Sequence, residues 1–274
     1  MAEMVKKATR ESYGEALVEL AEDYPQVVVL DADLAAATKT GMFKKAYPER
    51  FIDCGIAECN MVGIAAGLAA CGKIPFATSF AMFSAGRAFE QVRNSVGYPK
   101  LNVKIVGSHA GISVGEDGAT HQCNEDIALM RTIPGMVILN PADHYEMKAA
   151  VKAAIEYHGP VYIRLGRLAV ESFNNSDNYK FELGKGITLR DGKDITIVAT
   201  GLMVSRAIKA TEELEKQGID ARLINIHTIK PLDRELILKA AKETGRIITV
   251  EEHNIIGGLG EAVCSLLSEE CPTP

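Results

Sequence analysis

The sequence predicts an α/β fold made of two doubly wound domains with mostly parallel sheets. Short apolar segments alternate with segments of helical periodicity along almost the whole chain. The apolar segments lack the alternation of apolar and polar residues that marks a half-exposed strand, which indicates parallel strands covered on both faces. The 274 residues are enough for about two domains of ~150 residues each.

The first domain is expected to span residues 1–167. Its predicted strands are the short apolar segments 27–30, 76–80, 103–106, 136–139 and 161–164. The segments between them carry apolar residues at helical spacing. This spacing predicts helices over 10–23, 57–70, 84–96, 124–131 and 143–157.

Residues 168–185 interrupt the alternation because they are polar and include the asparagine-rich run 174–178. Such a composition is typical of a linker. A second alternation follows over residues 186–274. Its predicted strands are 194–199, 221–226 and 247–250, and its predicted helices are 203–217, 233–243 and 258–267. The alternation stops at Pro274, where a further strand is expected, so we expect this second domain to be short or truncated.

Composition and charge exclude several classes of protein. Apolar residues at 47% and charged residues at 24% are typical of a globular chain. A net charge of −6 gives no general attraction to nucleic acid or to an anionic membrane. The sequence has no apolar run long enough for a transmembrane helix and no apolar core of a signal peptide near its start. The six cysteines form no CxxC pair, which favours reduced thiols in the cytoplasm over disulfides or a zinc site.

The predicted helix 57–70 is apolar on nearly every side and carries Gly63 and Gly67 one turn apart. A helix that is apolar all round is expected to be buried all round. Glycine costs ~1 kcal/mol in a helix interior, so two of them suggest a close approach of another backbone. Two interpretations remain open: a core helix on its own sheet, or a helix at a subunit interface.

Glu58 stands at the start of that apolar helix. A carboxyl group in apolar surroundings holds its proton more tightly and can share it with a nitrogen atom of a ligand. The alternative is an acidic residue that only complements the helix dipole.

The densest polar segment is 109–121, which holds His109, Glu116, Asp117 and His121. It follows a predicted strand, and open α/β sheets bind their ligands outside the carboxyl ends of their strands. Its side chains suit hydroxyl groups and oxyanions. The spacing of the two histidines matches no standard metal motif. A solvated surface loop is the alternative.

Three arginines and two phenylalanines complete the candidates. Arg10, Arg164 and Arg167 stand at ends of predicted elements, where a guanidinium can clamp a phosphate, although surface arginines are usually only solvated. Phe80 and Phe83 follow a predicted strand. They are either ordinary core residues or a stacking platform for a flat heterocycle.

Together these segments resemble the C-terminal half of transketolase, and the resemblance covers nearly the whole chain. Its most specific blocks are residues 51–58, 78–83, 115–122, 224–232 and 250–260. The family uses thiamine diphosphate. Its middle domain binds the aminopyrimidine ring of this cofactor, and its last domain is structural.

The resemblance implies a role for each matching residue. Glu58 resembles the catalytic glutamate that protonates the pyrimidine ring and so drives the imino tautomer that deprotonates the thiazolium carbon. Phe83, with Phe80, resembles the wall on which the pyrimidine stacks. His121, implied as the second catalytic residue, and Asp117 resemble residues that contact sugar hydroxyls.

The sugar phosphate is implied to bind Arg10, His109 and Arg167, which match the family's positively charged groups. The helix at Glu58 is implied to be the interface helix, because the family builds its site between chains. The family's phosphate-binding serine falls near Ala37, and the sequence leaves open whether Thr38 replaces it. A family tyrosine is replaced by Gly86.

A larger departure is the motif that holds the diphosphate and its Mg²⁺. The family uses Gly-Asp-Gly followed by Asn-Asn, and Gly-Asp-Gly does not occur in this sequence. The resemblance is therefore to the C-terminal subunit of a split transketolase. It implies a second, N-terminal subunit that holds most of the magnesium site, and a cytoplasmic heterotetramer of the pentose phosphate pathway. The family's terminal strand and helix are not found after Pro274.

Other functions compete with this one. Half of a 1-deoxyxylulose-5-phosphate synthase or a β-subunit of a 2-oxoacid dehydrogenase would share the glutamate helix. His109 at a strand end and Glu116 before Asp117 favour transketolase. The remaining alternative is a regulatory or scaffolding subunit without activity, against which the joint presence of Glu58, Asp117 and His121 argues.

Overall fold

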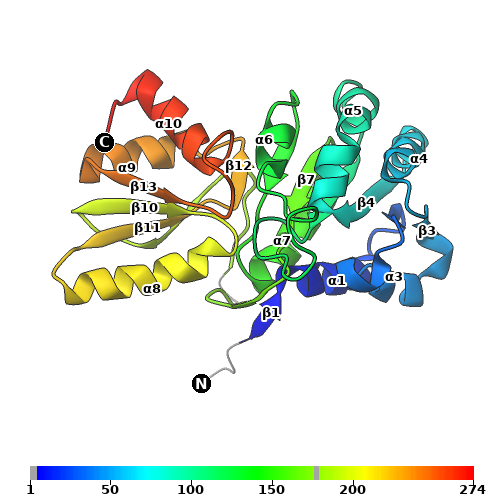
Figure 1. Cartoon of the computed structure of the whole chain (residues 1–274), viewed down its shortest axis with the longest axis horizontal. Coiled ribbons are helices and arrows are strands. Elements are labelled where there is room, and N and C mark those ends of the chain that lie inside the picture. Colours follow the sequence, from blue (N-terminus) through cyan, green and yellow to red (C-terminus); the bar gives the residue numbers. More distant parts are fainter. Residues whose placement is uncertain (1–4, 176–178) are drawn as a thin grey trace.

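The computed structural model describes residues 5–175 and 179–274 and confirms the predicted fold class. Two α/β domains lie side by side, the first coloured blue to green and the second yellow to red in Figure 1. Within the described residues, no helix is long and apolar enough to cross a membrane.

The first domain contains a seven-stranded sheet in the order β12-β6-β7-β5-β4-β2-β3. All neighbouring strands are parallel except β12, which is antiparallel to β6. The strands are β2 (Val27–Asp31), β3 (Phe51–Asp53), β4 (Ile74–Phe80), β5 (Lys104–Ser108), β6 (Val137–Leu139), β7 (Val161–Arg164) and β12 (Thr228–Lys230). Strand β12 comes from the second half of the chain, so the two halves share this sheet.

Helices cover both faces of this sheet, as the lack of alternation in its strands predicts. In β2, Val27 and Val29 face a core formed with α1 and α7, whereas Val28 and Leu30 face a core formed with α4. The helices are α1 (Thr9–Leu20), α2 (Ala35–Thr38), α3 (Gly41–Ala46), α4 (Glu58–Ala70), α6 (Asp126–Arg131) and α7 (His144–Glu156), with a 3₁₀ turn η1 (Pro48–Arg50).

The helix predicted over residues 84–96 is wrong in type. Two π-helical turns, η2 (Met82–Arg87) and η3 (Val92–Gly97), flank the short α5 (Phe89–Gln91). A π turn takes an extra residue, and such turns are frequent at functional sites. Apolar spacing cannot separate a π turn from an α turn.

The second domain has a four-stranded sheet in the order β13-β10-β11-β9. Strand β9 is antiparallel to β11 and was not predicted, because it is a short edge strand with little apolar signal. Helix α8 lies on one side of the sheet, and α9 and α10 lie on the other (Figure 1). The bounds are β9 (Ile187–Arg190), β10 (Ile195–Ala199), β11 (Ala221–Asn225), β13 (Ile247–Val250), α8 (Met203–Lys216), α9 (Arg234–Thr244) and α10 (Leu259–Glu270).

The segment between the domains starts with a strand. Strand β8 (Ala169–Glu171) pairs antiparallel with β1 (Lys6–Ala8). The backbone N–H groups of Phe173 and Asn174 then donate to the buried Asp143. Residues 176–178 of the polar run lie outside the described residues.

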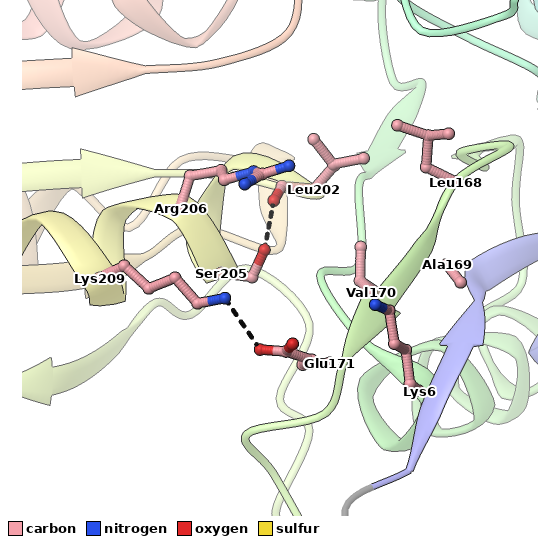
Figure 2. A pocket seen from close by; sticks show the side chains of 9 residues that line it. All are labelled: Lys6, Leu168, Ala169, Val170, Glu171, Leu202, Ser205, Arg206 and Lys209. Carbon is pink, nitrogen blue, oxygen red and sulfur yellow. Dashed lines mark hydrogen bonds and ion pairs between the residues drawn. The ribbon is translucent and has the colours of Figure 1, made fainter.

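Figure 2 shows a polar cleft where β1 and β8 approach the start of α8. Its ion pair joins Lys209 to Glu171 with 3.1 Å between Nζ and Oε2. None of the predicted site residues lines this cleft, so the candidate site lies elsewhere.

Candidate active site

The predicted site residues come together at the carboxyl edge of the first sheet. The strand register pairs Phe80, at the end of β4, with Ser108, at the end of β5. Arg164, at the end of β7, pairs with Gly107. The segments that follow these strands therefore leave the sheet at one edge, where open α/β sheets bind ligands.

Glu58 is the first residue of α4, and only 2% of its surface is exposed. Both of its carboxylate oxygens accept hydrogen bonds from Nη1 of Arg87, at 3.0 and 2.9 Å. A buried carboxylate needs such a partner because burial removes its hydration. Arg87 was not among the site residues predicted from the sequence. Its position four residues after Phe83, within one helical segment, was the available signal.

Arg87 also covers the ring of Phe83. Its guanidinium carbon lies 4.4 Å from the centre of that ring, which is a favourable cation–π geometry. Phe80 and Phe83 lie nearly parallel, with 6.0 Å between ring centres and 11° between planes. Glu58, Arg87 and the two phenylalanines thus form one connected wall.

His121 and His109 extend this wall. The imidazole of His121 meets the ring of Phe83 edge-on at 5.3 Å. The imidazole of His109 stacks on Phe80 at 4.1 Å. The predicted cofactor residues and the predicted substrate residues are therefore in direct contact.

His109 is held in one orientation. It has a positive φ of 56°, which is uncommon outside glycine and is found at functional sites. Its Nδ1 lies 2.9 Å from Oγ of Ser108, and its Nε2 lies 3.3 Å from Nη1 of Arg10. Burial, together with the positive charges of Arg10 and Arg167, lowers the pKa of His109 to about 4. The ring is therefore neutral near pH 7.

Arg10 and Arg167 give this end of the site a positive charge. Arg10 donates to the carbonyl oxygen of Ala37 at 2.8 Å. Arg167 pairs with the exposed Glu116 at 3.5 Å. The Arg167 guanidinium lies against Gly115, where an added Cβ would meet Nη1 at 2.1 Å. The two arginines and the neutral His109 can hold an anion.

The loop that carries Asp117 and His121 is anchored by the second domain. Glu252 accepts a hydrogen bond from the N–H of Ser113 at 2.7 Å. Asp117 itself is exposed, and its charge acts on His109.

The structure contradicts phosphate binding by two of the candidates, Arg164 and Thr38. Arg164 is 4% exposed and forms an ion pair with the buried Asp126 at 2.8 Å. Its guanidinium is therefore bound inside the protein and does not reach a phosphate. Thr38 is fully buried, and its hydroxyl donates to Asp31 at 2.7 Å. Thr38 therefore does not replace the family's phosphate-binding serine.

In the single chain, helix α4 is not buried on every side, which contradicts the interpretation as a core helix packed on its own sheet. Met61, Val62, Ala65 and Ala66 are buried, but the face with Gly63 and Gly67 is exposed. A Cβ added at either glycine would have no described atom within 4 Å. The glycines therefore serve no close packing among the residues that the structure describes.

Comparisons with known proteins decide the family. Residues 5–172 match the pyrimidine-binding domain of transketolase, and residues 184–273 match its C-terminal domain. The chain belongs to the transketolase family. The expectation of an enzyme subunit is thereby confirmed, as is the resemblance to the C-terminal part of a split transketolase.

Among transketolase relatives, a putative transketolase C-terminal section from Methanocaldococcus jannaschii is 53% identical over 265 residues, covering 96% of this chain and 83% of the relative. A 6-deoxy-6-sulfo-D-fructose transketolase subunit from Clostridium sp. is 48% identical over 265 residues, covering 97% of this chain and 82% of the relative. A solved structure described as a split gene transketolase, inactive beta4 tetramer, is 54% identical with a TM-score of 0.92. It covers 98% of this chain and 88% of that chain.

Proposed function

We propose that this chain is the C-terminal subunit of a thiamine-diphosphate-dependent transketolase, which transfers a two-carbon ketol unit between ketose and aldose phosphates. The observation that carries the proposal is the buried carboxylate of Glu58, which Arg87 joins to the ring face of Phe83. We propose that residues 1–167 form the domain that carries this site. Residues 168–185 would then link it to a structural domain of residues 186–274.

The residues present fit the aminopyrimidine part of the cofactor. This ring is flat and carries a nitrogen that can share a proton with a carboxyl group, so it suits the face of Phe83 and the oxygens of Glu58. When bound, thiamine diphosphate supplies a thiazolium carbon that stabilises a carbanion. The role proposed for Glu58 is to hold a proton at the pyrimidine ring nitrogen.

We assign the diphosphate and Mg²⁺ to a second, N-terminal subunit. The described residues contain no group of three or more His, Cys, Asp or Glu side chains that could hold a metal ion. The family motif for the diphosphate is not in this sequence. This chain would supply the pyrimidine half of the cofactor site and the partner the other half.

The sugar substrate is proposed to lie with its anionic end at Arg10, His109 and Arg167. The two guanidinium groups attract the anion, and the neutral imidazole of His109 can donate or accept a hydrogen bond there. Asp117 and His121 face the same region and are proposed to contact the sugar hydroxyls, with His121 as a catalytic residue. The relative named for a sulfosugar supports an anionic sugar without deciding between sulfonate and phosphate.

The exposed face of α4 supports association between copies of this chain. Gly63 and Gly67 lie on that face with open space above them, and Ile56, just before the helix, is 78% exposed. The related split transketolase described as an inactive beta4 tetramer supports both self-association and inactivity without a partner. We propose a heterotetramer of two copies of each subunit, acting in the pentose phosphate pathway of the cytoplasm.

Reconstitution tests the proposal. This chain is purified alone and together with a candidate N-terminal subunit, and ketol transfer from a ketose phosphate to an aldose phosphate is assayed with thiamine diphosphate and Mg²⁺. Transfer by the pair, dependent on added cofactor, is expected. A pair that assembles, binds the cofactor and transfers no ketol unit would contradict the proposed reaction.

A further inference from the structure

Arg87 makes the two contacts that the proposed function assigns to the aminopyrimidine ring. We propose that the guanidinium of Arg87 occupies the pyrimidine site of the cofactor-free chain and is displaced when the ring binds. Arg87 would then be a determinant of cofactor affinity. This inference rests on the proposed cofactor site at Glu58 and Phe83.

The geometry makes the two occupants mutually exclusive. Nη1 of Arg87 lies within 3.0 Å of both oxygens of Glu58, and the guanidinium carbon lies 4.4 Å from the ring centre of Phe83. A guanidinium and a protonated aminopyrimidine are both planar groups that can present one N–H to a carboxylate, and here the N–H comes from Nη1 of Arg87. Two such groups cannot stack on the same ring face and bind the same two oxygens at once.

The second aromatic ring of this wall, that of Phe80, offers no exposed face on which a flat ligand could stack. The ring of Phe80 is 6% exposed and is stacked against His109 at 4.1 Å. The edge of His121 approaches Phe83 at 5.3 Å. A flat ligand that reaches Glu58 through the Phe83 face therefore has to move Arg87.

Arg87 is free to move, whereas Glu58 is not. The Arg87 side chain is 48% exposed, and its described contacts are those with Glu58 and Phe83. Leaving the site would place the guanidinium in water, at the cost of its contacts with Glu58 and Phe83. Glu58 is 2% exposed and needs a partner in either state, because an unpaired buried charge is strongly destabilising. Arg87 provides that partner before the cofactor arrives.

The backbone supports this exchange. Arg87 is the last residue of the π turn η2, and its carbonyl oxygen lies 3.5 Å from Sγ of Cys59 in α4. The backbone is thereby held near Glu58 while the long side chain can swing. A displaceable side chain of this kind keeps the pyrimidine site ordered in the cofactor-free subunit.

Calorimetry on the complex of this chain with its N-terminal subunit tests the inference. Thiamine diphosphate is titrated, with Mg²⁺ present, into cofactor-free complexes with the wild-type chain, R87M and R87Q. Methionine keeps the length and removes the ion pair, and glutamine keeps a hydrogen bond to Glu58 without the charge. We expect affinity to rise at least about threefold in R87M, with R87Q in between, because less is broken on binding.

R93M is the matched control, because it removes the same charge from the exposed Arg93, whose guanidinium donates to the side chain of Asn94. R93M should bind the cofactor as the wild type does. If R87M fails to assemble, R87Q alone should still bind more tightly than the wild type. Unchanged or weaker binding in an assembled Arg87 variant overturns the inference. A wild-type complex that binds no thiamine diphosphate overturns both this inference and the proposed function.

A crystal structure of the cofactor-loaded complex examines the displacement directly. The Arg87 guanidinium should lie away from both Glu58 and Phe83, with the pyrimidine ring in its place. A structure in which Arg87 keeps both contacts and the ring binds elsewhere contradicts the inference.

Discussion

The ring of Phe80 stacks on the imidazole of His109 with 4.1 Å between ring centres and 30° between planes. This contact joins the aromatic wall proposed for the cofactor to the group of Arg10, His109 and Arg167 proposed for the sugar anion. Phe80 ends strand β4, and His109 follows the end of β5 directly, so the pairing of these two strands fixes the contact. The two halves of the proposed reaction site are therefore positioned by one sheet edge.

Removing the acid at Glu58 should abolish most of the activity while leaving the fold intact. E58Q keeps the shape and a hydrogen-bonding group but cannot hold a proton for the pyrimidine, so a loss of ~10²–10⁴-fold in kcat is expected. The assay uses the complex with the partner subunit, and thermal unfolding monitors the fold. E90Q, at the exposed Glu90 of α5, should retain full activity. Full activity in E58Q would remove Glu58 from the cofactor role.

Arg10 and Arg167 should bind the charged end of the substrate. Losing one charge-assisted hydrogen bond costs about 1.5–3 kcal/mol, so R10M or R167M should raise the KM for a ketose phosphate by ~10- to 100-fold. The KM for the same ketose without its phosphate should hardly change. Equal effects on both substrates would show that the arginines do not bind the phosphate.

His109 should make the protein sensitive to acid. The pKa of this residue is about 4 in the folded chain against an ordinary 6.5, so the unfolded chain binds more protons between these values. Stability therefore falls as the pH falls from 6.5 to 4, by at most about 3 kcal/mol for this one group. Asparagine tolerates the positive φ, so H109N should keep the fold and lose less stability over this range.

Chemical unfolding at pH 6.5 and at pH 4.5 measures the effect. The difference between the two values should be smaller in H109N than in the wild type. H158N, at the exposed His158, should behave as the wild type. A pH dependence in H109N that equals that of the wild type would show that the histidine is not held neutral.

The exposed face of α4 should mediate assembly. G67L places a large side chain where the isolated chain has open space and removes a helix-disfavouring glycine worth ~1 kcal/mol. The variant chain should therefore fold at least as stably as the wild type, yet associate less. Light scattering after size-exclusion chromatography gives the mass. A210L, at an exposed position of α8, should leave the assembly unchanged, and an unaltered mass for G67L would exclude this face from the interface.

Several parts of the fold follow from local patterns. The strands around Val27 and Ile163 were predictable because fully buried strands are short and apolar throughout. Strand β12 was not, since Thr228–Lys230 is recognisable only from its pairing with β6, about ninety residues earlier in the chain.

The candidate site also has residues that local sequence patterns predict and contacts that they do not. Glu58 and Phe83 stand out through their setting and through the family resemblance. The contact between Glu58 and Arg87 does not, because the two are 29 residues apart and lie in different elements, α4 and η2. Whether Thr38 replaces the family's phosphate-binding serine was left open by the sequence, because only the structure shows that its hydroxyl donates to the buried Asp31.

The proposed division of the active site between two subunits is tested by the rate of ketol transfer, measured while this chain is titrated with its N-terminal partner subunit at saturating thiamine diphosphate and Mg²⁺. We expect no transfer without the partner and a rate that rises and saturates as the partner is added. A pure preparation of this chain that transfers ketol units strongly by itself would contradict this division.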